Sequence, residues 1–259
     1  MKKLHVLLAV VITFIVLPSL SFSKDISTIR FGTSPDYPPF ESKSPDGKLV
    51  GIDIDLGNAV CAQLHAKCEW VEGDFDGLIP SLKARKIDVI LSGMMATDQR
   101  KKEIDFSDKL YSAHSRLLVS KASTLQPTAE SLRGKSVGVL QGSVEETIAK
   151  AQWANSGVTV VPYANQDQAL ADLVNGRLDG VLVEQIQAGV GFLKTERGRG
   201  FKFAGGPIVV NGVADYTAMG LRKDDPSLRQ SINGALQKIR SDGTYTTITH
   251  KYVDFDISN

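Results

Sequence analysis

The sequence predicts an α/β protein built from two α/β units, and three observations support this. Strand-like segments alternate with helix-like segments, the alternation is interrupted by a polar stretch at 123–128, and it then starts again. Such a βαβα alternation is typical of a parallel sheet covered by helices. The chain of 259 residues is long enough for two units that each have a hydrophobic core.

The first unit is expected to contain three strands and two helices. The predicted strands are Ile29–Gly32, Cys68–Val71 and Asp88–Leu91, and the predicted helices are Asp53–Leu64 and Leu78–Lys86. Asp53 is expected to cap the first helix, because its side chain can accept a hydrogen bond from a free backbone N–H. Pro80 suits the first turn of the second helix.

The second unit repeats the same alternation. Strands are expected at Ser136–Leu140, Val158–Val161 and Leu178–Val183, with one helix starting at Ser143 and another at Asp167–Asn175. Gly176 is expected to end the latter helix.

A final helix is expected at Ser227–Arg240. Its apolar side chains form one stripe that needs a partner surface, for which the first unit is a candidate; they are Leu228, Ile232, Ala235, Leu236 and Ile239.

The first 23 residues have the features of a secretory signal peptide. Lys2 and Lys3 precede an apolar run, 4–17, which Pro18 ends, and 21–23 offers small residues at the cleavage positions. The run is too short for a membrane span of ~20 residues. No cysteine stands at the cleavage point to carry a lipid anchor. We therefore expect a soluble, exported protein.

The charge and the cysteines narrow the range of functions. A formal net charge of +1 argues against nucleic acid or an anionic membrane as the main partner. Cys61 and Cys68 would meet an oxidising compartment, which favours a disulfide. The alternative, a metal site assisted by His65, lacks one ligand of a closed zinc site, so we predict no metal.

Two segments are candidate seats for a carboxylate. The run from Ser92 to Arg100 follows a strand, and arginine can grip a carboxylate with two parallel hydrogen bonds. In open α/β sheets, ligands bind at this edge. The alternative is an arginine that is merely solvated.

The second seat is the start of the helix at Ser143. A glycine turn precedes it, and Ser143 with Glu146 fits a capping box. The free N–H groups and the dipole at a helix start favour an anion. The alternative is an ordinary capped helix. The glycine pattern matches neither a P-loop nor a dinucleotide-binding fingerprint, so no nucleotide cofactor is expected.

Two aromatic residues and one acid complete the pattern. Tyr37 and Phe75 follow strand ends and are candidate walls for a ligand, or else core residues. Glu184 follows a strand directly and could pair with an ammonium, or simply sit at a helix start. Arg100 for a carboxylate and Glu184 for an ammonium would together suit an α-amino acid held between the two units.

No catalytic set is recognisable. His65, His114 and His250 lack a nucleophile partner or metal-ligand spacing, and neither the Gly-x-Ser-x-Gly nor the His-Glu-x-x-His motif is present.

Six short runs carry a resemblance to a known family. They are Gly51–Leu56, Phe75–Leu82, Phe106–Asp108, Val139–Ser143, Gly176–Asp179 and Gly220–Asp225. Over essentially the whole chain after the signal, the sequence resembles the periplasmic polar amino acid-binding proteins of ABC importers, solute-binding protein family 3. It is most similar to the lysine/arginine/ornithine- and histidine-binding branch, which has a disulfide where Cys61 and Cys68 stand.

The resemblance implies an α/β, type II periplasmic binding protein fold, in which two lobes close on one ligand about a two-segment hinge. Residues 1–23 would be the signal peptide, 24–111 and 218–259 the first lobe, 112–115 and 209–217 the hinge, and 116–208 the second lobe. It also implies a periplasmic monomer without cofactor that delivers an amino acid to an inner-membrane ABC permease.

The resemblance assigns roles to individual residues. Tyr37 and Phe75 would sandwich the ligand side chain. Ser92, the backbone of Gly93, and Glu184 would hold the ammonium group. The α-carboxylate would bind Arg100 and the amides of Met95 and Val144, and the second lobe would further contribute Leu140 and Ser143.

Four positions depart from the pattern of the branch. Ser34 stands where an aspartate engages the ligand's distal cation, Glu184 stands in place of aspartate, and Met95 and Val144 replace hydroxyl residues. The acids that could restore negative charge are Asp36, Glu41 and Glu145. From the resemblance to the branch, the expected ligand is a polar or basic L-amino acid of the lysine/arginine/ornithine/histidine class. Because of the departures, a neutral polar amino acid such as glutamine is the alternative.

An enzyme is a further alternative, because periplasmic cyclohexadienyl (prephenate/arogenate) dehydratases resemble the same family. Their catalytic acid would lie about one turn beyond Glu184, where this chain has Gln187. An amide cannot donate a proton as a general acid, so no enzymatic activity is expected.

Overall fold

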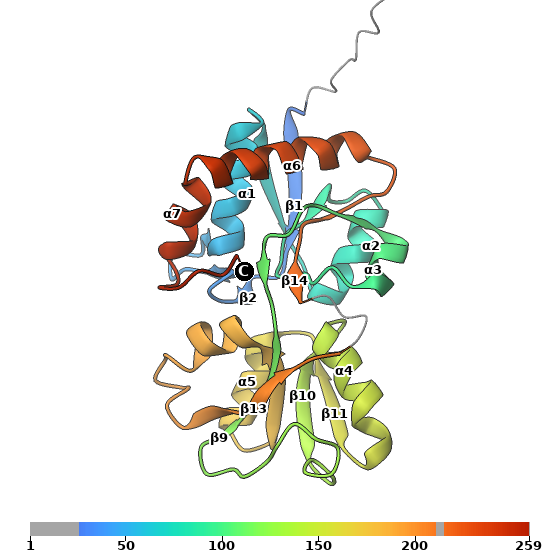
Figure 1. Ribbon diagram of the computed structural model, residues 1–259, viewed down its shortest axis with the longest axis vertical. Helices are drawn as coiled ribbons and strands as arrows, with labels where there is room; N and C mark the ends of the chain where they lie inside the picture. The colour runs from blue at the N-terminus through green and yellow to red at the C-terminus, as the bar shows by residue number, and fades with distance from the viewer. Residues whose placement is uncertain (1–25, 211–214, 259) are drawn as a thin grey trace, which may run out of the picture.

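The computed structural model describes residues 26–210 and 215–258, so the predicted signal peptide lies outside the described residues. They form two lobes, each built on a five-stranded sheet (Figure 1). The predicted α/β class with two units is confirmed.

The sheet of the first lobe is mixed rather than parallel. Its strand order is β5-β1-β6-β15-β7, with β5 at Lys67–Glu72, β1 at Thr28–Thr33, β6 at Val89–Ile90, β15 at Gly220–Leu221 and β7 at Asp105–Phe106. β1 runs parallel to β5 and β6, whereas β15 runs antiparallel to both β6 and β7. A strand from the end of the chain thus lies inside the sheet.

The described part of the first lobe contains the helices α1 (Ile52–Gln63), α2 (Leu78–Lys83), α3 (Asp98–Glu103), α6 (Pro226–Ser241) and α7 (Thr244–His250). The apolar stripe of α6, Leu228 to Ile239, is buried in one core with residues of β1 and α1. Figure 1 shows α6 lying across the first lobe, away from the second. The first lobe is therefore the partner surface that the stripe requires.

The second lobe has the strand order β11-β10-β12-β9-β13. The strands are β11 (Thr159–Tyr163), β10 (Ser136–Leu140), β12 (Gly180–Glu184), β9 (Ser115–Ser120) and β13 (Phe201–Ile208). Its helices are α4 (Val144–Gln152) and α5 (Gln166–Val174), with short helical turns η2 (Ala154–Ser156) and η3 (Gln187–Phe192). Strand β9 runs antiparallel to both β12 and β13, and β9 and β13 together extend the three strands that the sequence predicts for this sheet.

Smaller elements lie near the boundary between the lobes. A three-stranded sheet consists of β2 (Asp36–Tyr37), β3 (Glu41–Lys43) and β4 (Leu49–Val50), and the turn η1 spans Phe75–Gly77. Strand β8 (Tyr111–Ser112) pairs with β14 (Tyr216–Thr217), close to where the chain passes between the lobes (Figure 1).

The prediction that Asp53 caps α1 was wrong. The helix begins at Ile52, and Gly51 is its N-cap with φ 135°. Only glycine fits there, because a Cβ would lie 2.1 Å from the carbonyl oxygen of Phe40. Asp53 is instead fully buried, and its carboxylate accepts hydrogen bonds from the Gly93 N–H (2.8 Å) and the Tyr111 hydroxyl (2.8 Å).

Other local predictions are confirmed. Ser143 caps α4 by accepting a hydrogen bond from the Glu146 N–H at 3.0 Å. Gly176, with φ 72°, follows the end of α5. Cys61 and Cys68 form a disulfide with an S–S distance of 2.09 Å, which joins α1 to β5. Because both thiols are used in this bond, the alternative metal site with His65 is wrong.

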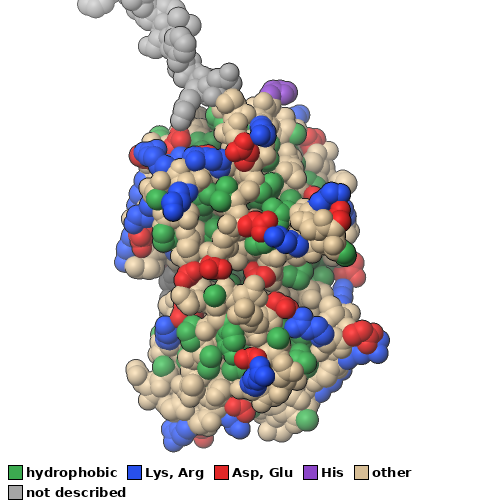
Figure 2. Space-filling model, turned by 180° about the vertical axis from the view of Figure 1, so that it is seen from behind, with side chains coloured by type: hydrophobic (Ala, Val, Ile, Leu, Met, Phe, Trp, Pro, Cys, Tyr) green, Lys and Arg blue, Asp and Glu red, His purple; other side chains and the backbone are tan. Residues whose placement is uncertain are grey.

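On the face that Figure 2 shows, neither sign of charge dominates the surface. Figure 2 shows lysine and arginine side chains interspersed with aspartate and glutamate over both lobes on that face. Within residues 26–210 and 215–258, no helix combines the length and apolar character needed to cross a membrane.

Candidate functional site

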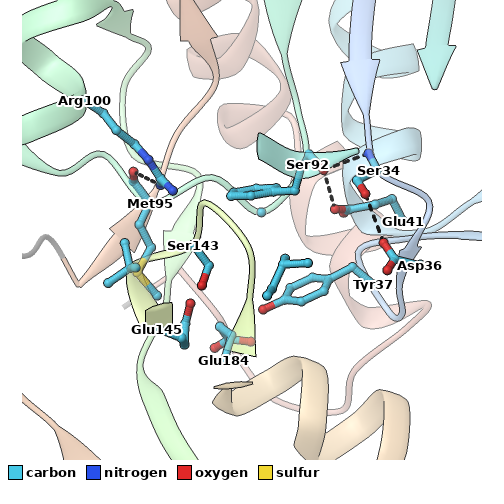
Figure 3. Close-up of a pocket in the computed structure, with 14 residues that line it drawn as sticks. Ser34, Asp36, Tyr37, Glu41, Ser92, Met95, Arg100, Ser143, Glu145 and Glu184 are labelled. Atoms are coloured by element: carbon cyan, nitrogen blue, oxygen red, sulfur yellow. Dashed lines mark hydrogen bonds between the residues drawn. The ribbon is translucent and has the colours of Figure 1, made fainter. Parts of the chain in front are cut away.

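A cavity lined by residues of both lobes lies between them (Figure 3). All eleven residues that the sequence suggested as ligand contacts line it: Ser34, Tyr37, Phe75, Ser92, Gly93, Met95, Arg100, Leu140, Ser143, Val144 and Glu184. Three acids complete the lining, namely Asp36, Glu41 and Glu145. Residues separated by up to 150 positions in the sequence are thus brought to one cavity.

Arg100 lies at one end of the cavity. It projects from α3, a short helix capped by the Thr97 side chain. Its guanidinium donates hydrogen bonds to the carbonyl of Met95 (2.8 Å) and, across the lobe boundary, to that of Gly142 (3.0 Å). Burial lowers the pKa of Arg100 to about 10, so it remains a cation at neutral pH. Since a guanidinium has five donors, donors remain for a ligand carboxylate.

The start of α4 lies at the same end of the cavity as Arg100, in the wall that the second lobe contributes. The Ser143 hydroxyl is used as the helix cap, while Val144 and Glu145 occupy the first helical turn and line the cavity. The first N–H groups of a helix have no partner within the helix, and the dipole adds positive potential there. Together with Arg100, this end of the cavity suits a carboxylate.

Glu184 ends β12 and is 4% exposed. Its carboxylate accepts hydrogen bonds from the backbone N–H groups of Gln187 (2.8 Å) and His114 (3.4 Å). Burial raises its pKa to about 7, and the nearby charge of Glu145 acts in the same direction. Burial thus makes the ionised carboxylate of Glu184 unfavourable, and a ligand ammonium would offset this, since an opposite charge favours the ionised form.

The aromatic residues form apolar walls. Phe75 is 8% exposed and packs in one cluster with Leu140 of the second lobe and Tyr37. The Arg100 guanidinium lies 5.4 Å from the centre of the Phe75 ring. Gly93 has φ 57°, and its N–H donates to Asp53, so only its carbonyl oxygen is available for a ligand.

The structure places Asp36, which the sequence left unplaced. One carboxylate oxygen accepts a hydrogen bond from the Ser34 hydroxyl at 3.1 Å. The other accepts from the backbone N–H of Gln166 in the second lobe at 2.5 Å. Both oxygens of Asp36 are therefore engaged, one of them across the lobe boundary.

Glu41 and Glu145 are also located. Glu41 is 1% exposed; its Oε1 accepts a hydrogen bond from the Ser92 hydroxyl at 2.8 Å, and its Oε2 has no partner among the described residues. Glu145 accepts a hydrogen bond from the Ser115 hydroxyl at 2.7 Å. In Figure 3, Ser34, Asp36 and Glu41 lie at the side of the cavity opposite Arg100.

The lobes touch on more than one side of the cavity. The Gln141 amide donates to the Asp76 carboxylate at 2.6 Å, and a Cβ at Gly142 would lie 2.8 Å from the Cβ of Asp76. A Cβ at Gly191 would lie 2.0 Å from the carbonyl oxygen of Pro38 in the first lobe. The lobes are thus in a closed arrangement.

These features define a two-lobe protein with a polar cavity enclosed between the lobes. The chain belongs to the bacterial extracellular solute-binding proteins, family 3, whose model matches residues 29–255. The predicted family is confirmed.

Individual relatives are similar over most of their length. The chain is 52% identical to the lysine/arginine/ornithine-binding periplasmic protein of Escherichia coli K12, over 89% of each chain. It is 47% identical to the histidine-binding periplasmic protein of the same organism, over 99% of each. An ancestral arginine-binding protein bound to arginine superposes with a TM-score of 0.82 at 37% identity, covering 88% of this chain and 99% of the other.

Proposed function

We propose that this protein is the substrate-binding component of an ABC amino acid importer, and that its ligand is an L-amino acid with a cationic side chain. The observation that carries this proposal is the charge of the cavity. Among the described residues, its lining contains four acids, Asp36, Glu41, Glu145 and Glu184, and one cation, Arg100. Buried charges need partners of opposite sign, so such a lining favours a ligand with net positive charge.

The proposed pose follows from the two ends of the cavity. The α-carboxylate binds Arg100 and the start of α4, and the α-ammonium binds Glu184 at the end of β12. The side chain extends between Tyr37 and Phe75 toward Glu41. The names of the relatives support this reading, since they bind lysine, arginine, ornithine or histidine.

The remaining parts of the proposal concern the protein's setting. Residues 1–23 direct export to the periplasm, where the protein acts as a monomer and delivers its ligand to an inner-membrane permease. Residues 112–115 and 209–217 act as the hinge. No reaction is proposed, because the position expected for a dehydratase acid holds the buried amide of Gln187.

A neutral polar amino acid is the second candidate ligand. Ser34 favours it, because this hydroxyl takes the place of a carboxylate that would pair with a distal cation. The Ser34 hydroxyl donates to Asp36, whose carboxylate is already engaged across the lobes. Glutamine is the representative of this class.

A binding screen tests the proposal. Ligand-free protein is heated with each common L-amino acid and with ornithine, since a ligand at 100 times its dissociation constant adds ~2.7 kcal/mol to the free energy of unfolding. We expect arginine, lysine and ornithine to give the largest shifts. A screen in which only aliphatic amino acids or sugars stabilise the protein would reject both candidate classes.

A further inference from the structure

Two carboxylates are buried side by side beneath the far end of the cavity. Glu41 of β3 is 1% exposed and Asp53 of α1 is fully buried. The two segments are in direct contact, because the Asp53 N–H donates to the carbonyl of Phe40, the residue before Glu41. Two consecutive residues also donate hydrogen bonds to the pair: the Ser92 hydroxyl to Glu41 and the Gly93 N–H to Asp53.

Among the described residues, this pair has no cation that balances its charge. In the parts of the chain that the structure describes, neither carboxylate forms a salt bridge with lysine, arginine or histidine. The groups that face Glu41 are acidic or phenolic: Asp53 of α1, Asp36 and Tyr37 of β2, and Tyr111 of β8, whereas β4 offers only Leu49 and Val50. Two adjacent buried carboxylates without a cation cannot both be charged, so one of them holds a proton.

The hydrogen bonds identify which carboxylate holds it. Asp53 accepts from two donors, the Gly93 N–H and the Tyr111 hydroxyl, and these stabilise its charged form. Glu41 accepts from Ser92 alone, and its Oε2 has no partner in residues 26–210 and 215–258. Burial and the charge of Asp53 raise the pKa of Glu41 well above its usual range, in agreement with the geometry.

We propose that Glu41 and Asp53 share one proton and so allow the far end of the cavity to accept either a cationic or an uncharged polar side chain. A cation displaces the proton from Glu41 Oε2 to solvent and binds the resulting carboxylate. An uncharged ureido or amide oxygen instead accepts a hydrogen bond from the protonated Glu41. This rests on the proposed function, because it assigns the side-chain end of the same amino acid site.

L-Arginine and L-citrulline are matched probes, since they have similar shapes and differ in the charge of the side-chain end. Calorimetric titrations in buffers of different ionisation enthalpy count the protons released with each. The α-ammonium meets Glu184 with both ligands, so any proton released there cancels in the comparison. We expect arginine to release about one proton more than citrulline, and arginine affinity to rise with pH more steeply than citrulline affinity.

The variant Glu41→Gln tests the assignment to Glu41. Its amide keeps the size of the side chain but cannot become an anion, so arginine should bind about a hundredfold or more weakly. Citrulline affinity should stay within a few-fold, and the difference in proton release should vanish. Glu145→Gln, which removes another acid of the same cavity, should keep the difference.

The outcomes separate this inference from the proposed function. If no amino acid binds the wild-type protein, the proposed function is wrong. If arginine and citrulline both bind with equal proton release, only the proton-sharing pair is wrong, and this result needs no variant to fold. Failure of citrulline to bind, or a proton difference that survives in Glu41→Gln, would also overturn the proposal.

Discussion

The carboxylate of Asp36 accepts a hydrogen bond from the backbone N–H of Gln166 at 2.5 Å, and this bond joins the two lobes at the start of α5. The N–H belongs to the first residue of the helix, where the dipole favours a negative charge. The same carboxylate accepts a hydrogen bond from Ser34, which lines the cavity. Closure of the lobes and the shape of the cavity are thus linked through one side chain.

We predict that Asp36→Ala speeds ligand release. A hydrogen bond to a charged group contributes about 1.5–3 kcal/mol, and this one forms only when the lobes meet. Stopped-flow kinetics should show a dissociation rate at least tenfold higher, with a nearly unchanged association rate. Asp46→Ala, at an exposed turn in the same lobe, is the control. Equal dissociation rates for wild-type and Asp36→Ala proteins would contradict this role.

We predict that Arg100→Ala abolishes amino acid binding without unfolding the protein. Loss of one partner from a buried charge pair costs on the order of 3–5 kcal/mol, which is more than a hundredfold in affinity. Calorimetry measures the affinity, and thermal unfolding checks the fold. Lys101→Ala changes the next residue of α3, whose side chain is exposed, and should bind normally. An affinity loss below tenfold in Arg100→Ala rejects the proposed carboxylate contact.

From the raised pKa of Glu184, we predict that the free energy of unfolding depends on pH. Burial raises its pKa in the folded protein to about 7 from an ordinary value of 4.5. Between these values the folded state holds a proton that the unfolded state has lost, so the free energy of unfolding falls as pH rises, by about 3 kcal/mol in total. Glu41 and Asp53 also hold protons more tightly in the folded state, so ligand-free Glu184→Gln should keep part of the decrease and lose about 3 kcal/mol of it when unfolding is followed in urea.

The same variant tests the ammonium contact. Glu184→Gln should weaken binding of an amino acid and leave binding of its desamino analogue unchanged. If both ligands weaken equally, the side chain has a structural role only.

We predict that Gly142→Ala hinders closure. Its φ of 74° strains any other residue by roughly 1–2 kcal/mol, and the added Cβ would lie 2.8 Å from that of Asp76 in the first lobe. Gly157→Ala is a matched control, with φ 83° but 3.6 Å to the nearest atom, a side-chain carbon of Arg133 in the same lobe. Both should lose similar stability, and only Gly142→Ala should lose tenfold or more in affinity by calorimetry. Equal affinities in the two variants would show that the contact is unimportant.

The disulfide should contribute to stability and not to binding. It closes a loop with a sequence separation of 7, for which chain entropy predicts about 2 kcal/mol. Replacing Cys61 and Cys68 together by serine should lower the free energy of unfolding by this amount and leave ligand affinity within a few-fold. A large loss of affinity would mean that the bond also shapes the cavity.

Local sequence signals predicted much of the fold and less of the site. The Ser143 cap of α4 and the Gly176 stop of α5 depend on neighbouring residues, and the structure has them where the sequence indicates. Asp53 was misassigned because an acid at the start of a helical pattern is a cap signal, whereas its real partners, Gly93 and Tyr111, are 40 and 58 residues away. Gly93 and Tyr111 come close to Asp53 only through the tertiary structure.

The positions of the acids at the far end of the cavity could not be predicted from local sequence signals either. Glu41 lies on a short strand after Pro38 and Pro39, where no periodicity indicates which side chains point inward. Asp36 meets a partner 130 residues away. Strand β9 was missed because Leu117, Leu118 and Val119 are all buried, which removes the alternation expected of a half-exposed strand. That the eleven cavity residues contact ligand stays a prediction.

The strand order of the first sheet affects the order in which the two lobes can complete their folding. Strand β15 lies between β6 and β7, so until Gly220 and Leu221 arrive the sheet is divided and β7 has no neighbour. The second sheet uses only strands between Ser115 and Ile208, and it can assemble as soon as that stretch has emerged. A chain that emerges amino end first therefore completes its middle before its beginning, and the carboxyl-terminal segment sets the moment at which the first lobe becomes resistant to proteases.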